Sequence, residues 1–346
     1  MKTKVKLTGG AFATLAACVG SPAFAQSSLT LYGNLDTSLA WYNTGNENTI
    51  RMNSGSTWGS RFGLKGSEDI GDGYRIIFKL EQGFSSNSGA AADPTAAFSR
   101  ESYIGLSGDF GTLQIGKMQT PTYVPSGGYY DAFLVNTMAS GFNNFELESV
   151  RQNNAVMYWS PTIHGFSTQL MLGLRDATMT PTSGVNNYHA AVEYNEGPWA
   201  LATSYESIEN SMNTSALHAY FGGGSYGFDK WRVFLGYHHA TETDGTVNNN
   251  DYAISLRYQL DAQTTLAGGY AWVHSGGSTA PGTADQFSVE VRTYLSKTTE
   301  IYASLSDLRN RGKTAFTLNG ATVAGVPAAG PGIGVRGAEI GVLHFF

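Results

Sequence analysis

Apolar and polar residues alternate along many segments of this chain, and this alternation restricts the possible folds more than any other feature. In segment 29–41 the odd-numbered residues are mostly apolar, whereas the even-numbered ones include Asn34 and Asp36. The same pattern recurs in segments 74–81, 231–238, 252–259 and 287–292. A period of two residues is typical of β-strands. The sequence therefore predicts strands with one apolar face and one polar or charged face.

From this pattern and the turn residues between segments we predict sixteen antiparallel strands. They span residues 29–42, 57–66, 74–84, 98–107, 112–118, 153–160, 167–175, 188–195, 199–208, 215–223, 229–240, 250–259, 264–274, 285–295, 298–310 and 333–346. Short connections such as 66–73 and 108–111 alternate with long polar ones such as 43–56, 118–152 and 311–332. An even number of strands places both ends of the chain on one side, so the last strand can pair with the first.

Alternation alone does not separate a membrane barrel from a soluble β-sandwich, because both have one apolar face. Three features favour the barrel: aromatic residues end many apolar faces, the segments are about ten residues long, and short connections alternate with long ones. Beyond the N-terminal segment no run of about 18 apolar residues occurs, which excludes a transmembrane helix. A closed all-β barrel is the remaining way to cross a bilayer. A β-propeller has a similar repeat length, but its Gly-His and Trp-Asp signatures do not recur here.

The N-terminus has the pattern of a secretory signal peptide. Lys2, Lys4 and Lys6 precede an apolar stretch, and small residues stand before Gln26. We predict a signal peptide over residues 1–25, with the barrel formed by 26–346. A lipid-modified Cys18 is the alternative, but it would shorten the apolar stretch and leave the downstream cleavage site unused. Cleavage after Ala25 removes the only cysteine, so the mature chain has no disulfide.

The charge of the chain limits its partners. It has 21 basic and 27 acidic residues, a net charge of −6, and loss of the signal lysines makes the mature chain more acidic. This balance argues against a nucleic-acid partner. Charged residues make up 14% of the chain, against about a quarter in ordinary soluble domains. A surface that partly contacts membrane lipid agrees with this composition.

Several of these segments resemble the general-diffusion porins of the neisserial and burkholderial type. The resemblance rests on residues 28–36, 60–73, 78–84, 99–106, 110–117, 153–161 with 165–166, and 341–346. It implies a sixteen-stranded, water-filled barrel in the outer membrane of a Gram-negative bacterium, assembled as a homotrimer, with its third long loop folded into the lumen. It also implies passive diffusion of inorganic ions and small hydrophilic solutes, and recognition of Phe346 by the outer-membrane assembly machinery.

The connection 118–152 is the longest in the chain, and unstructured loops of such length are usually functional. Its acidic residues Asp131, Glu146 and Glu148 are expected to lie opposite basic residues of the wall. The candidate residues of the pore constriction are Arg61, Arg75, Arg100, Asp131, Glu146, Glu148 and Arg151. Basic wall against acidic loop would make a transverse field that discriminates between ions. The resemblance points to Arg61, Arg100 and Arg151 in particular.

The alternative for these arginines is structural pairing with inward carboxylates such as Asp36, Glu81 and Glu290, and this alternative is strongest for Arg75 and Lys79. A channel specific for sugars or phosphate stays open because Tyr32, Tyr294 and Tyr302 are predicted to face inward. A barrel enzyme with Ser and His at its rim is a weaker alternative, since no pairing of these residues follows from the sequence. No cofactor is predicted, and His238 and His239 lack metal-ligand spacing because adjacent strand residues point to opposite faces.

Overall fold

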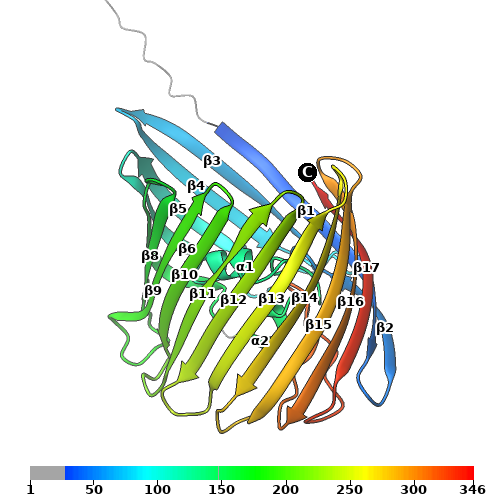
Figure 1. Ribbon diagram of the computed structural model, residues 1–346. Helices are drawn as coiled ribbons and strands as arrows, with labels where there is room; N and C mark the ends of the chain where they lie inside the picture. The colour runs from blue at the N-terminus through cyan, green and yellow to red at the C-terminus, as the bar shows by residue number, and fades with distance from the viewer. Residues whose placement is uncertain (1–27, 147) are drawn as a thin grey trace, which may run out of the picture.

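A computed structural model describes residues 28–146 and 148–346, which form one antiparallel sheet of seventeen strands closed on itself (Figure 1). The predicted signal peptide, residues 1–25, lies outside the described residues. The strands are β1 (Ser28–Asn43), β2 (Asn48–Ser54), β3 (Arg61–Gly71), β4 (Tyr74–Gly83), β5 (Glu101–Gly108), β6 (Gly111–Gln119), β7 (Arg151–Trp159), β8 (Phe166–Leu174), β9 (Val185–Glu196), β10 (Trp199–Glu209), β11 (Ala216–Phe228), β12 (Trp231–Glu242), β13 (Asn248–Gln259), β14 (Thr264–Ser275), β15 (Gly282–Tyr294), β16 (Thr299–Gly312) and β17 (Val335–Phe345). Two short helices, α1 (Tyr123–Tyr129) and α2 (Phe142–Phe145), follow β6. In the described part of the chain, neither helix is long and apolar enough to cross a bilayer.

The sheet closes because β1 pairs with strands on both of its sides. It pairs with β17 from Asn34 opposite Phe345 to Asn43 opposite Arg336. On its other side β1 pairs first with β3 and then with β2. Since β2 and β3 follow one another along the same edge, they fill one position in the wall. The wall thus has sixteen positions, which confirms the predicted sixteen-stranded antiparallel barrel.

One predicted loop and one predicted turn are wrong in their extent. Residues 43–56 were expected to form a long loop, but 48–54 form β2, in which Ile50 and Met52 alternate with polar neighbours. The many Asn and Ser residues around them hide this alternation in the sequence. The next strand runs to Gly71 instead of ending near 66, and the turn is confined to Asp72 and Gly73, which both have positive φ angles (53° and 79°).

Burial of the two faces of the strands separates the barrel from a sandwich. Leu39 is 54% exposed and Leu29 68% exposed on the apolar face of β1. On the opposite face Asp36 is 0% and Asn34 3% exposed. A soluble sandwich buries its apolar face and wets its polar face. Here the apolar face is on the outside and the polar face is enclosed, as a membrane barrel requires.

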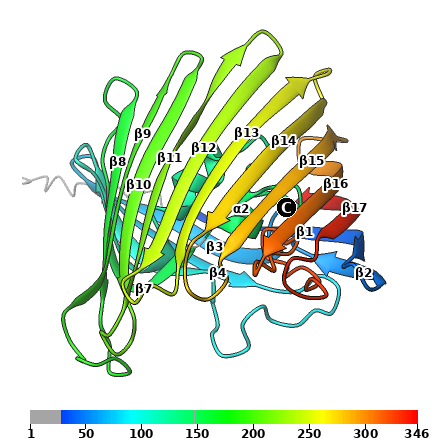
Figure 2. The same cartoon turned by 60° about the horizontal axis from the view of Figure 1, so that its bottom comes forward.

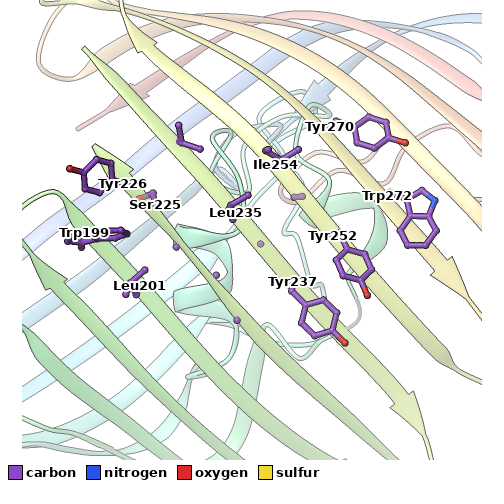
Figure 3. Close-up of a pocket in the computed structure, with 16 residues that line it drawn as sticks. Trp199, Leu201, Ser225, Tyr226, Leu235, Tyr237, Tyr252, Ile254, Tyr270 and Trp272 are labelled. Atoms are coloured by element: carbon purple, nitrogen blue, oxygen red, sulfur yellow. The ribbon is translucent and has the colours of Figure 1, made fainter. Parts of the chain in front are cut away.

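Aromatic pairs lie near both ends of the outward face. Trp199 packs on Tyr226 with ring centroids 4.5 Å apart, and Tyr237 packs on Tyr252 at 5.1 Å. Between these pairs the outward positions Gly222 and Gly224 of β11 carry no side chain, and an apolar hollow of about 620 Å³ lies across β10 to β14 (Figure 3). Aromatic residues at both interfaces are typical of outer-membrane barrels.

The segment between β6 and β7 bonds to inward-facing side chains of distant strands, and α2 is seen within the ring of strands (Figure 2). The backbone N–H of Ala132 donates to Ser255 Oγ on β13 (2.7 Å), and that of Met138 donates to Glu339 Oε1 on β17 (3.0 Å). Phe145 of α2 meets Phe316 of the β16–β17 connection edge to face, with centroids 5.2 Å apart. A cluster of buried apolar residues thus lies between this segment, the β16–β17 connection and the wall.

Close approach of this segment to the wall depends on Gly236 of β12. A Cβ atom there would lie 2.5 Å from the Tyr130 carbonyl oxygen and 3.0 Å from its Cα. Gly236→Val is therefore expected to destabilise the protein by about 1–3 kcal/mol, as overpacking does. Urea unfolding followed by tryptophan fluorescence measures this. Gly222→Val is the matched control, because a Cβ at Gly222 meets no atom within 4 Å; equal losses for both variants would contradict the prediction.

Candidate pore constriction

Three of the predicted arginines come together on the inner wall. Arg61 begins β3, Arg100 directly precedes β5, and Arg151 begins β7. All three line one cavity of about 270 Å³, together with Tyr123 of α1 and Thr322 of the β16–β17 connection. The register of strands β3 to β7 therefore gathers residues that are up to 90 positions apart in the sequence.

Glu81 of β4 is the carboxylate next to this cluster. Arg100 Nε donates to Glu81 Oε1 (2.7 Å), and Arg61 Nη1 lies 3.6 Å from the same oxygen. Lys79 forms ion pairs with Glu81 and with Glu101. In the described part of the chain Arg151 forms no ion pair. Two carboxylates thus face four cations, and the cluster keeps an excess of positive charge.

Asp131 is held by groups of its own loop. Its carboxylate accepts hydrogen bonds from the backbone N–H groups of Phe133 (2.9 Å), Leu134 (3.1 Å) and Gly141 (3.1 Å) and from the Ser140 hydroxyl (2.8 Å). Burial raises the pKa of Asp131 to about 6, while these hydrogen bonds oppose the rise. The residue fixes the turn between α1 and α2, and it makes no ion pair with the arginines.

Glu146 and Glu148 also lie away from the arginine cluster. They face β12, where Glu146 Oε2 is 2.7 Å from His238 Nδ1 and Glu148 Oε2 is 3.9 Å from His238 Nε2. Both carboxyl side chains are 2% exposed. Burial holds the pKa of each well above its usual range. The structure therefore groups the three arginines at the wall of β3 to β7, and it groups the two glutamates of the connection against β12.

Arg75 lies outside the cavity. It is exposed and stands opposite Asp69 of β3, next to the turn at Asp72 and Gly73. Glu81 lies six positions further along β4, about 20 Å away along an extended strand. The sequence places Arg75 and Glu81 on the same inward face, but their spacing along the strand sets Arg75 near the rim.

Two groups of residues that line the cavity were not predicted from the sequence. Thr57, Trp58 and Gly59 line the cavity, although they were expected within a strand. They form the break between β2 and β3, where Asp36 accepts from the N–H groups of Thr57 (2.6 Å) and Trp58 (2.9 Å). Residues Ala321 and Thr322 come from a connection that was predicted only as a long polar loop. Nothing local in the sequence signals that such loops turn inward.

The inward tyrosines are used as hydrogen-bond donors to carboxylates. Tyr32 donates to Glu81 (2.8 Å) and Tyr302 donates to Asp36 (2.6 Å). Tyr294 is 45% exposed at the end of β15. These contacts give no aromatic track along the lumen, so they do not favour a sugar-specific channel.

Residues 223–227 fit the Gly-x-Ser-x-Gly pattern that surrounds the nucleophile of many hydrolases. That function needs a sharp turn between a strand and a helix. Here Ser225 lies inside β11, which is followed by another strand, and its hydroxyl accepts a hydrogen bond from Arg232 Nη1 (2.8 Å). The pattern is therefore structural in this chain.

Comparison with known proteins gives a consistent result. Residues 11–313 match the family described as Gram-negative porin. An outer membrane porin protein of Bordetella pertussis is 30% identical over 286 residues, which are 73% of each chain. Outer membrane porin protein 32 of Delftia acidovorans is 27% identical over 97% of this chain and 98% of its own length. An anion-selective porin from Comamonas acidovorans shares the fold, with a TM-score of 0.78, 23% identity, and coverage of 93% of this chain and 100% of that one.

Proposed function

The chain belongs to the Gram-negative porin family and is an outer-membrane β-barrel, and from this premise we propose that it forms a diffusion channel that passes small anions more readily than cations. The observation that carries the proposal is the cluster of Arg61, Arg100 and Arg151 around one cavity. Fixed charge at a narrow point is how a wide pore discriminates between ions. The relatives are named as porins, and we infer a channel without enzymatic activity.

The position of the acidic residues strengthens the proposed anion preference. A transverse field would need Asp131, Glu146 and Glu148 to face the arginines across the pore. Instead Asp131 binds groups of its own loop, and the two glutamates face His238. These three carboxylates are thus enclosed, and among the described residues the carboxylates that pair with the cations of the arginine cluster are Glu81 and Glu101.

The reversal potential of single channels in a KCl gradient tests the proposal. We expect a potential of the sign that corresponds to higher chloride than potassium permeability. The preference should grow as salt falls, because the screening length increases from about 10 Å at 0.1 M to about 30 Å at 0.01 M. A preference for potassium at low salt would refute the proposed role of the cluster.

We also propose that the channel is a homotrimer. A related barrel, OmpT of Vibrio cholerae, has been solved in a trimer form and shares the fold with a TM-score of 0.71 at 18% identity. Native mass spectrometry of the folded protein is expected to give three chains per particle. A particle of one chain under mild detergent conditions would contradict this.

Processing of the N-terminus gives a separate prediction. The mature chain should begin at Gln26, because Ala23 and Ala25 fit the signal peptidase site. Intact mass measurement of protein purified from outer membranes checks this. Fatty acid on Cys18 would show that the lipoprotein interpretation is correct.

A further inference from the structure

A second cluster of charged side chains lies where the end of the long connection meets the wall at β12 and β13. Glu146 and Glu148 come from the connection, His238 from β12 and Asp251 from β13. Besides the two glutamate contacts, His238 Nδ1 is 3.3 Å from Asp251 Oδ2. All four side chains are at most 2% exposed. The cluster is thus enclosed and separate from the arginine cavity.

Several atoms of this cluster have no hydrogen-bond partner in the described part of the chain. They are His238 Nε2, both carboxylate oxygens of Glu146, Glu148 Oε1 and Asp251 Oδ1. The short contact between Glu146 and His238 therefore lacks hydrogen-bond geometry. Buried polar atoms without partners are rare in folded proteins, and each needs a physical explanation.

The charges of the cluster do not balance. Among the described residues no lysine or arginine forms an ion pair with Glu146, Glu148 or Asp251. Even a fully protonated His238 would neutralise only one of three ionised carboxylates. A buried carboxylate without a compensating cation is strongly destabilising. Either protons or a bound cation must supply the missing positive charge.

We propose that Glu146, Glu148 and His238 bind a divalent transition-metal ion of the zinc class. Each residue offers one ligand atom, and these atoms lie within 4.8 Å of one another. Zinc bonds to imidazole nitrogen and carboxylate oxygen are about 2.0–2.2 Å long and the geometry is tetrahedral, so two ligand atoms of one ion are about 3.4 Å apart. Side-chain rotations that shorten these ligand-to-ligand distances would complete the site.

The unpartnered Nε2 atom of His238 is the nitrogen assigned to the ion. Nδ1 then carries the proton and faces Asp251 Oδ2 at 3.3 Å. The Glu146 carboxylate, whose Oε2 lies 2.7 Å from Nδ1, has to turn toward Nε2 to bind the ion. A carboxylate that holds the second nitrogen of a ligating histidine is a common feature of metal sites, and it fixes the orientation of the ring. An imidazole ligand selects the zinc class over calcium and magnesium, which prefer oxygen ligands alone.

The test is zinc binding by the full-length folded protein without a histidine tag, stripped with EDTA and titrated with Zn²⁺ in a calorimeter. We expect one high-affinity ion per chain, and much weaker binding of Ca²⁺. His238→Gln and Glu148→Gln should each weaken Zn²⁺ binding at least tenfold. Asp251→Asn should weaken it by about 10–100-fold, the usual effect of losing such an orienting carboxylate.

His239→Gln is the matched control. His239 is the next residue of the same strand, its Nδ1 lies 3.0 Å from the Asn249 carbonyl oxygen, and its ring stacks on exposed Tyr220. Its loss should leave Zn²⁺ affinity unchanged. Folding of each variant is checked by its heat-modifiable mobility, and the isosteric Glu148→Gln decides if His238→Gln does not fold. Absence of Zn²⁺ binding in the wild type, or equal affinity in wild type and Glu148→Gln, would overturn the proposal.

Discussion

Arg151→Ser, Arg100→Ser and Arg61→Ser are each expected to shift the reversal potential of the channel toward cation preference. Arg151 should have the largest effect, because no described carboxylate forms an ion pair with it. A unit charge about 8 Å from a permeating ion contributes about 0.5 kcal/mol in water. Removing this charge raises the energy of chloride in the pore and lowers that of potassium by the same amount. The ratio of chloride to potassium permeability should therefore fall about fivefold. Combining Arg151→Ser with Arg100→Ser should reverse the preference.

Arg75→Ser is the matched control for these variants. It removes the same charge from the same inner face, but about 20 Å from Glu81 along β4 and next to the turn at Asp72. Its effect on the reversal potential should be small at 0.1 M salt, where charges more than about 10 Å away are screened. If Arg75→Ser matches Arg151→Ser, the selectivity reflects total charge and not the cavity. If the folded arginine variants all equal the wild type, these residues only support the wall.

The fold could be predicted from the sequence because the barrel depends on a local property. Each strand needs one apolar face, and a period of two is visible in any segment such as 29–41. The direction of that face is not local, since both sandwiches and membrane barrels show the same alternation. In the structure Leu39 is exposed and Asp36 is fully buried, so the apolar face points outward and the polar face inward.

The candidate site was predictable only in part. Arg61, Arg100 and Arg151 lie at or next to strand ends, so the strand pattern carries them to one level of the wall. The acidic residues belong to a connection whose path is set by contacts with distant strands, such as those of Ala132 with Ser255 and Met138 with Glu339. No pattern in residues 118–152 identifies those partners. The sequence therefore does not tell whether a carboxylate in this loop stabilises the loop itself, as Asp131 does, or lines the pore.

The same limit explains why the His238 cluster has no signature in the sequence. Its ligands come from one connection and one strand that are about 90 residues apart, and the adjacent His239 points away. Metal motifs are recognised when their ligands share one local element with fixed spacing. In this chain, Glu146 and Glu148 come near His238 because the connection packs against β12.

Deletion of Phe346 is expected to cause a severe loss of the folded form in the outer membrane. Phe346 N–H donates to the Gly33 carbonyl (3.0 Å) and its carbonyl oxygen accepts from Gly33 N–H (3.0 Å), so this residue completes the seam between β17 and β1. Its ring lies against Gly33, where a Cβ atom would be 2.4 Å from the ring. The two backbone hydrogen bonds contribute about 1 kcal/mol each. We expect a larger effect in cells, because the resemblance assigns Phe346 to recognition by the assembly machinery.

Two variants separate closure of the seam from recognition of the aromatic ring. Phe346→Ala keeps the backbone bonds to Gly33 and removes the ring, while His344→Gln changes a neighbour on the same exposed face that bonds to Thr299 (2.8 Å). The heat-modifiable band in outer-membrane fractions measures folded protein for each. Deletion should lower it most, Phe346→Ala should lower it at least severalfold, and His344→Gln should leave it near the wild-type level. Wild-type assembly of the deletion variant would show that the barrel closes and is recognised without its last residue.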